Sequence, residues 1–175
     1  VEEARDTQEE TKEQFKSALE QFSAVVNIES TELKQKYDLF SADLEKSESQ
    51  AKAVRDRIAS VESVAKDLFE EWQTELNQYS NDNLRQVSQQ KLTATQLQYD
   101  KLIGAMKQAE QKIEPVLTLF RDQVLFLKHN LNAQAIASIQ GELIEVESNV
   151  ASLIKEMETS IQEANTFINA MNKDK

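Results

Sequence analysis

Apolar residues recur three and four positions apart along almost the whole chain, which is the spacing of one face of an α-helix. The most regular run extends from Leu33 to Trp72, and eleven of its twelve positions are apolar or aromatic. Similar runs cover Leu92 to Leu131, residues 1–25 and residues 136–171. A repeat of this kind, kept in step over several heptads, is typical of helices that pack side by side.

Polar junctions separate these runs and set the expected helix boundaries. We expect four helices, over residues 2–28, 31–79, 82–130 and 133–172. Short connections make consecutive helices antiparallel neighbours. The predicted fold is therefore all-α, a single domain over residues 1–175 that forms an elongated antiparallel bundle or coiled coil with two very long helices.

Pro115 lies inside the third expected helix. A proline there removes one backbone N–H, and its ring clashes with the carbonyl four residues earlier. The apolar pattern nevertheless continues in step from Ile113 through Val116 to Phe120. We therefore expect a kink near Pro115 and not the end of a helix.

The composition agrees with long helices and excludes most other folds. The 175 residues include two glycines, one proline and no cysteine. A sheet protein needs turn-forming residues every eight to twelve positions, so a β-sandwich, a barrel or a doubly wound fold is excluded. The absence of cysteine also removes disulfides and thiolate chemistry.

The charge balance narrows the range of partners. Thirty-one acidic residues against twenty basic ones give a net charge of −11. Nucleic-acid binding rests on a clustered positive surface, and adhesion to anionic lipid needs basic segments. We therefore expect no nucleic acid as a partner. The most apolar stretch, residues 116–131, contains three charged residues and is too short to span a bilayer.

The sequence contains few residues that could catalyse a reaction or bind a metal ion. His129 is the only histidine, position 126 is Phe instead of the Glu of a di-metal Glu-x-x-His motif, and no carboxylate lies within four residues of it. Hydrolytic triads and glycine-rich phosphate loops are missing. The acidic first thirteen residues form either a solvated face or a docking strip for a basic partner. We expect no catalytic residue, no metal and no cofactor.

The segment from Val116 to Leu127 is apolar over about 260° of a helical wheel, far more than a two-helix seam buries. It is either surrounded by the other helices or leaves an apolar face for a second subunit or for lipid. The residues of this candidate interaction face are Leu117, Leu119, Leu125 and Phe126.

Three segments carry a resemblance to a known family: residues 2–6, residues 13–22 and, most distinctively, residues 120–133. They resemble a bacterial family of unknown function found mainly in gammaproteobacteria. The resemblance implies an apolar leader and a lipoprotein-type cysteine upstream of Val1, with the signal peptide removed and a coiled-coil body in the periplasm. Because Val1 already lies within the periodic pattern, we expect the N-terminus to be cut back.

The same stretch sets several polar residues in an apolar half-helix. Buried polar side chains must find partners, so we expect these residues to form one bonded network that fixes the turn between the third and fourth helices. The members of this predicted network are Arg121, Asp122, His129, Asn130 and Asn132.

The preferred function is a non-enzymatic structural or interaction protein of the bacterial cell envelope, a rod-like scaffold or spacer that presents a face to a partner. That partner is an unidentified protein or a second copy joined through helices, and the membrane is reached only through a lipid anchor upstream of Val1. One alternative is a membrane-associated remodelling or stress-response helical protein. A second is a ligand or metal carrier in the bundle core, and the alternative location is the cytoplasm.

Overall fold

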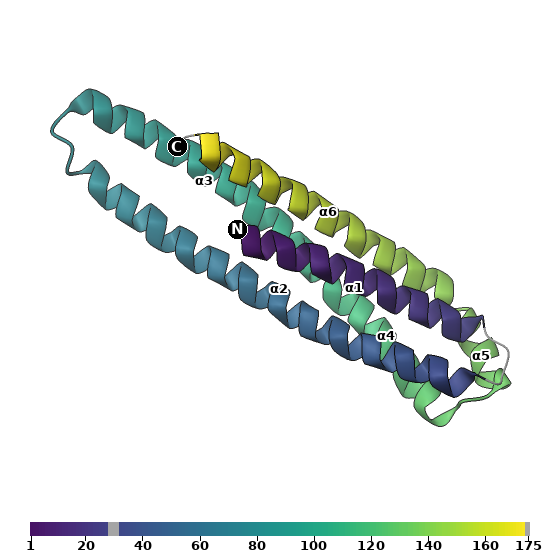
Figure 1. The fold of residues 1–175 in the computed structure, drawn as a ribbon. Coiled ribbons are helices and arrows are strands. Elements are labelled where there is room, and N and C mark those ends of the chain that lie inside the picture. The colour runs from purple at the N-terminus through teal and green to yellow at the C-terminus, as the bar shows by residue number, and fades with distance from the viewer. Residues whose placement is uncertain (28–31, 174–175) are drawn as a thin grey trace.

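The computed structural model describes residues 1–27 and 32–173, and this part of the chain forms six helices and no strand (Figure 1). The all-helical prediction is confirmed. The helices are α1 (Glu2–Val26), α2 (Leu33–Leu76), α3 (Asp82–Gln111), α4 (Ile113–His129), α5 (Ala133–Gln140) and α6 (Leu143–Lys173).

The helices lie side by side along one long axis (Figure 1). α1 packs against α2 and α6, and α3 with its continuation α4 packs against the same two helices. Each of these four rods runs antiparallel to its neighbours, as the short connections predict. The short α5 lies at the end where α4 and α6 are joined, and it contacts α1 and α4.

Two helices extend beyond the other two. α2 has 44 residues and α1 has 25, so at 1.5 Å per residue α2 is longer by about 28 Å. Figure 1 shows α2 and α3 continuing past the start of α1 and the end of α6 to their own turn. We call this two-helix projection, residues 70–92, the hairpin end, and the remaining four-rod part the body.

Four phenylalanines fill the body, and none of them is exposed to solvent. Phe15 and Phe22 come from α1, Phe40 from α2 and Phe120 from α4. Their rings form a continuous chain of contacts, with centroid separations of 6.4 Å for Phe15–Phe120, 5.5 Å for Phe40–Phe120 and 5.3 Å for Phe22–Phe40. Because three helices share these contacts, the cluster holds the rods in register.

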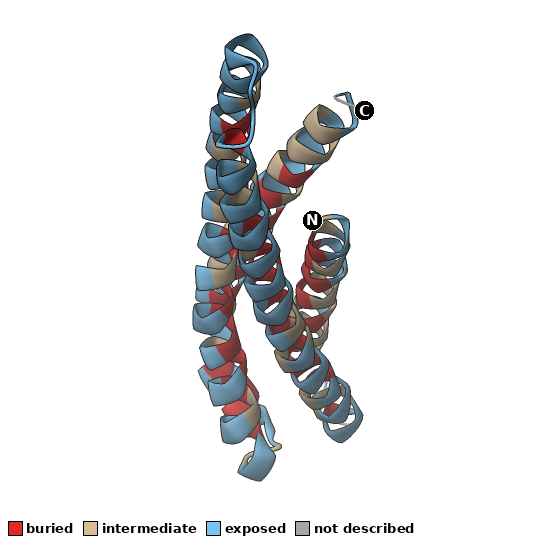
Figure 2. Cartoon of the chain, turned by 90° about the vertical axis from the view of Figure 1, so that its left-hand side faces the viewer, coloured by how far each residue is buried: buried red, intermediate tan, exposed pale blue. Residues whose placement is uncertain are grey.

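The apolar periodicity of α2 predicts its buried face as far as Ala65 and less well toward the hairpin end. Its repeating positions from Leu33 to Ala65 are buried apart from the half-buried Tyr37, whereas Leu68 is 40% exposed. Figure 2 shows the same gradient, with buried residues on the inner faces of the body and exposed residues over most of the projecting end. The hairpin end has only one helix to cover each inner face.

The expected third helix is divided in two at Lys112, between α3 and α4. The N–H of Lys112 bonds to the carbonyl of Ala109, three residues back instead of four. Pro115 has no N–H for the carbonyl of Gln111, and its ring crowds that carbonyl. The prediction of one helix with a kink at Pro115 is therefore not confirmed, and the interruption lies in the turn before the proline.

The expected fourth helix is also divided. α5 ends before Gly141 and α6 begins at Leu143. Asn132 starts α5, because its Oδ1 accepts a 2.9 Å bond from the N–H of Ala135, the usual role of an N-cap. Four helices were expected and six are described, although the four rods of the body keep their predicted order.

Candidate docking site

A groove lies beside the start of α1. In the body, α1 lies between α2 and α6, and both neighbours extend beyond the level of Val1. The groove has a volume of about 230 Å³. It is lined by residues of four helices, namely Val1, Glu3, Ala4, Arg57, Ser60, Val61, Val64, Ala65, Leu68, Phe69, Tyr99 and Phe167.

The wall that α2 contributes is apolar and partly open to solvent. Val61, Val64, Ala65 and Leu68 are three or four residues apart and therefore share one face of the helix. Val64 is 67% exposed and Leu68 is 40% exposed. Apolar side chains gathered in this way at the edge of a polar surface mark an interaction site more often than scattered ones do.

The floor of the groove is aromatic. Phe69 and Tyr99 meet edge to face, with ring centroids 5.4 Å apart, and so join α2 to α3. Burial raises the pKa of the Tyr99 hydroxyl above its ordinary 10.0, and the nearby Glu62 carboxylate raises it further. Tyr99 is therefore neutral at physiological pH, so the floor presents an uncharged, rigid surface.

Polar contacts fix the end of α1 against both neighbours. Arg57 of α2 donates a 2.7 Å hydrogen bond to the Glu3 carboxylate, and Arg5 donates a 3.1 Å bond to the side-chain oxygen of Asn165 on α6. Arg57 and Glu3 also line the groove, so the first of these contacts is part of its polar edge. Because the site is built on helices and not on loops, its walls are rigid.

The α6 side of the groove is also apolar. Phe167, Ile168 and Met171 lie at helical spacing and form a shallower hollow beside Val1 and Glu2. All three are half-buried. The groove therefore has apolar walls on α2 and α6, the two helices that enclose α1 in the body.

The exposed face of α2 changes from apolar to acidic toward the hairpin end. After Val64 and Leu68, the same face continues at helical spacing with Glu71 and Glu75. Both are exposed, and neither forms an ion pair within the described residues. A ligand lying along this face would therefore meet apolar side chains beside α1 and negative charge farther out.

The predicted polar network is not formed by its five members with one another. Arg121 of α4 donates 2.6 Å bonds to Glu48 of α2 and to Glu114. Arg55 donates to Glu114 as well, at 3.0 Å. These two arginines hold the pKa of the Glu114 carboxyl below its ordinary 4.5. Arg121 thus joins α4 to α2, whereas Arg55, which also donates a 2.9 Å bond to Glu110 of α3, spans the interruption at Lys112.

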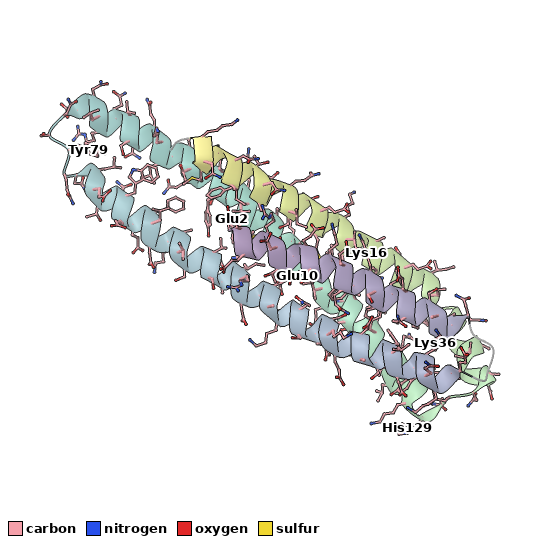
Figure 3. The ribbon with its side chains drawn as sticks, in the orientation of Figure 1. Glu2, Glu10, Lys16, Lys36, Tyr79 and His129 are labelled. Carbon is pink, nitrogen blue, oxygen red and sulfur yellow. The ribbon has the colours of Figure 1, made fainter. Side chains whose placement is uncertain are left out.

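The remaining four residues have separate places in α4 and in the turn that follows it. Asn130 donates a bond from its side-chain nitrogen to the carbonyl of Phe126 at 2.8 Å, and Asn132 caps α5. Asp122 and His129 are exposed, and no hydrogen bond joins any two of the five within the described residues. His129 lies near the end of the molecule opposite Tyr79, which marks the hairpin turn (Figure 3).

The predicted interaction face is split by the fold. Leu117 is only 1% exposed and Leu119 is half-buried against the core, so the body covers both. Leu125 is 66% exposed and Phe126 is 39% exposed. Only the second pair is left on the surface, because α2 and α6 enclose the other side of α4.

Catalytic and metal chemistry find no support in the described part of the chain. No three acidic, histidine or cysteine side chains come together there in a way that could hold a metal ion. Within the same residues, every helix is too short or too polar to cross a lipid bilayer.

Comparison with models of known protein families gives one match. A family model described as "Protein of unknown function (DUF2959)" matches residues 1–171. The chain belongs to the DUF2959 family. No curated protein and no solved structure matches it. The predicted resemblance to a family of unknown function is therefore confirmed.

Sequence reasoning missed the groove. The pattern treats Leu68 and Trp72 as ordinary core positions of a long helix, because periodicity shows which side of a helix is apolar and not what covers it. The lining of the groove comes from four helices, so it depends on how they pack together, which the pattern of one helix does not show.

Proposed function

We propose that this DUF2959 protein is a non-enzymatic, rod-like scaffold that presents an open helical face to a partner protein. The observation that carries the proposal is the hairpin end, where α2 and α3 project beyond α1 and α6. In the body the four rods cover one another's apolar stripes over most of their length, whereas a two-helix projection leaves helix faces free for another molecule. An enzyme would need converging polar groups in a concave site, and the groove beside α1 is mainly apolar.

The hairpin end has only two helices, but side-chain hydrogen bonds stabilise it. Trp72 donates a 2.8 Å bond from its indole nitrogen to the Ser88 hydroxyl, and Asn81 caps α3 by accepting bonds from the N–H groups of Asn83 and Leu84. The other residues of its surface are largely polar. These contacts support a stiff projection, which suits a scaffold because a rigid surface loses little entropy on binding.

The proposed location is the periplasmic side of the bacterial envelope, with a lipid anchor upstream of Val1. The resemblance in residues 120–133 supports it, together with the acidic surface, which gives the body no affinity of its own for anionic lipid. Protease treatment of intact cells and of spheroplasts, with the natural gene product detected by antibody, tests this. Cleavage only after the outer membrane is opened is expected, and protection in both samples would place the protein in the cytoplasm.

Photo-cross-linking in living cells tests the scaffold itself. A photoreactive amino acid is placed at Val64 or Val87 near the projection, and at Leu125 or Ile144 at the far end of the body; all four are well exposed. A discrete adduct with one protein, stronger from the first pair, is expected. The absence of an adduct from all four positions would overturn the proposal.

A further inference from the structure

The two halves of α1 are held in the body by different kinds of contact. In the first half, residues 2–14, the only buried apolar side chain is that of Ala4. The second half, residues 15–26, buries Phe15 and Phe22 completely. Because the burial of apolar surface is the main source of stability in a helical bundle, the first half is held less tightly than the second.

Polar contacts take the place of apolar packing along the first half. Ser160 of α6 donates a 2.6 Å hydrogen bond to Gln8, and Thr11 donates a 3.3 Å bond to the side-chain oxygen of Gln50 on α2. The side-chain nitrogen of Gln8 is buried and finds no partner among the described residues. A hydrogen bond of this kind adds little net stability, and an unpaired buried amide is destabilising. The contact of the first half with the body is therefore weak at its centre.

The surface beneath the first half is apolar. The contacts of Thr11 with Gln50 and of Glu3 with Arg57 place this half beside residues 50–57 of α2, and α6 lies on its other side. Large apolar side chains of the other three rods fill the core at about this level, and each is at most 5% exposed: Val54 and Ile58 of α2, Met106 of α3 and Met157 of α6. Removal of the first half of α1 would open an apolar groove between α2 and α6.

We propose that the first half of α1 is a releasable cover, which swings away from the body about the second half and exposes this groove. The phenylalanine cluster holds the second half in place while the cover opens. Six of residues 2–13 are acidic and two are basic, so the released segment is readily hydrated. Residues upstream of Val1 move with the cover. The inference goes beyond the proposed scaffold function and does not depend on it.

Labelling of a single introduced thiol tests the opening, because the chain has no cysteine of its own. Ser160→Cys places a thiol beneath the cover, and Val150→Cys places one on α6 nearer its start, beside the second half; both parent side chains are fully buried. Each purified variant is treated with a maleimide at several urea concentrations below its unfolding transition, and labelling is followed by mass spectrometry. The thiol at position 160 is expected to react at least about tenfold faster and with a weaker dependence on urea, because local opening exposes less surface than global unfolding.

A second matched pair leaves the bond between Ser160 and Gln8 intact. Ala164→Cys lies beneath the cover, next to Asn165, which accepts a bond from Arg5. Ala18→Cys lies in the second half of α1, and both parent alanines are fully buried. The same difference in labelling rate is expected. Circular dichroism and urea unfolding of each variant check that the fold is intact before rates are compared.

Filling the weak centre of the contact should close the cover. Gln8→Leu together with Ser160→Ala removes the unpaired amide, and in the Ala164→Cys background this change is expected to slow labelling by about tenfold. Ser148→Ala, on the exposed face of α6, is the control in the same background and should leave the rate unchanged.

Three results would overturn the inference: equal labelling rates within both pairs, a urea dependence at position 164 as steep as that of global unfolding, or labelling that does not slow when the amide is removed. The first two assign the exposure of the thiol to unfolding of the whole body, and the third assigns it to motion elsewhere in the core. Each leaves the scaffold proposal standing, because the cellular adducts test that proposal separately.

Discussion

A buried polar pair between α1 and α6 makes a counterintuitive prediction about stability. Ser160 donates a 2.6 Å hydrogen bond to the side-chain oxygen of Gln8, and the two residues are at most 1% exposed. The side-chain nitrogen of Gln8 is buried too and has no hydrogen-bond partner within the described residues. We expect the double variant Gln8→Leu, Ser160→Ala to be more stable than the parent chain.

The magnitude follows from the groups that change. A buried amide nitrogen without a partner costs about 1–3 kcal/mol, whereas the hydrogen bond that is lost contributes about 1 kcal/mol. Leucine at position 8 also adds apolar surface to the seam between α1 and α6. The expected gain in the free energy of unfolding is about 1–2 kcal/mol, which raises Tm by roughly 2–8 °C in a chain of this size.

Urea unfolding followed by circular dichroism at the helix band measures the effect, with Ser148→Ala on the exposed face of α6 as the neutral control. The single change Ser160→Ala is expected to lower stability by about 1–3 kcal/mol, since it leaves both polar atoms of the Gln8 amide unpaired. If the double variant is less stable than the parent by more than about 1 kcal/mol, the reasoning fails, and the pair must be fixing the register of the helices.

Three further predictions concern the core of the body, an ion pair on α4 and the cap of α5. Phe120→Ala should lower the free energy of unfolding by about 3–5 kcal/mol, because it opens a cavity in the centre of the phenylalanine cluster; a loss below about 1 kcal/mol in urea unfolding would contradict the packing. The pKa of Glu114 is lowered by bonds from Arg121 and Arg55. Its small contribution to the free energy of unfolding is therefore present at neutral pH and fades as pH falls below 4.5. The difference in urea midpoint between the parent and Glu114→Gln should accordingly shrink between pH 7 and pH 3.5, and a constant difference would refute the pairing. Asn132→Ala should cost about 0.5–2 kcal/mol through loss of the cap and should speed amide hydrogen exchange in α5 first; uniform exchange throughout the chain would argue against a local role.

The sequence pattern predicted the helices and their inner faces well, because burial in a bundle depends mainly on periodicity. The run from Leu92 to Leu127 has the spacing of one continuous helix face, and its members are buried or half-buried even across the interruption at Lys112. The interruption itself could not be placed by the pattern. Pro115 affects the turn before it, whereas the side chains on either side remain in step.

The candidate site was harder to predict, because the exposure of a side chain depends on which helices pack over it. Leu117 and Leu125 are equally apolar in the sequence, yet one is buried under α2 and α6 and the other faces solvent. Likewise, Arg121 lies in an apolar stretch but reaches Glu48, 73 positions away in the chain. Such contacts depend on how the helices pack against one another, and the periodicity of a single helix does not predict them.

The direction of the outer helices has a consequence for how the molecule can stand in the cell. α1 runs away from the hairpin end and α6 runs toward it, so both termini point to the same pole of the rod (Figure 1). An anchor attached through either terminus would hold that pole close to the anchoring surface. The opposite pole, with Leu125, Phe126 and Ile144 exposed on its sides, would then face the interior of the compartment and anything that diffuses there.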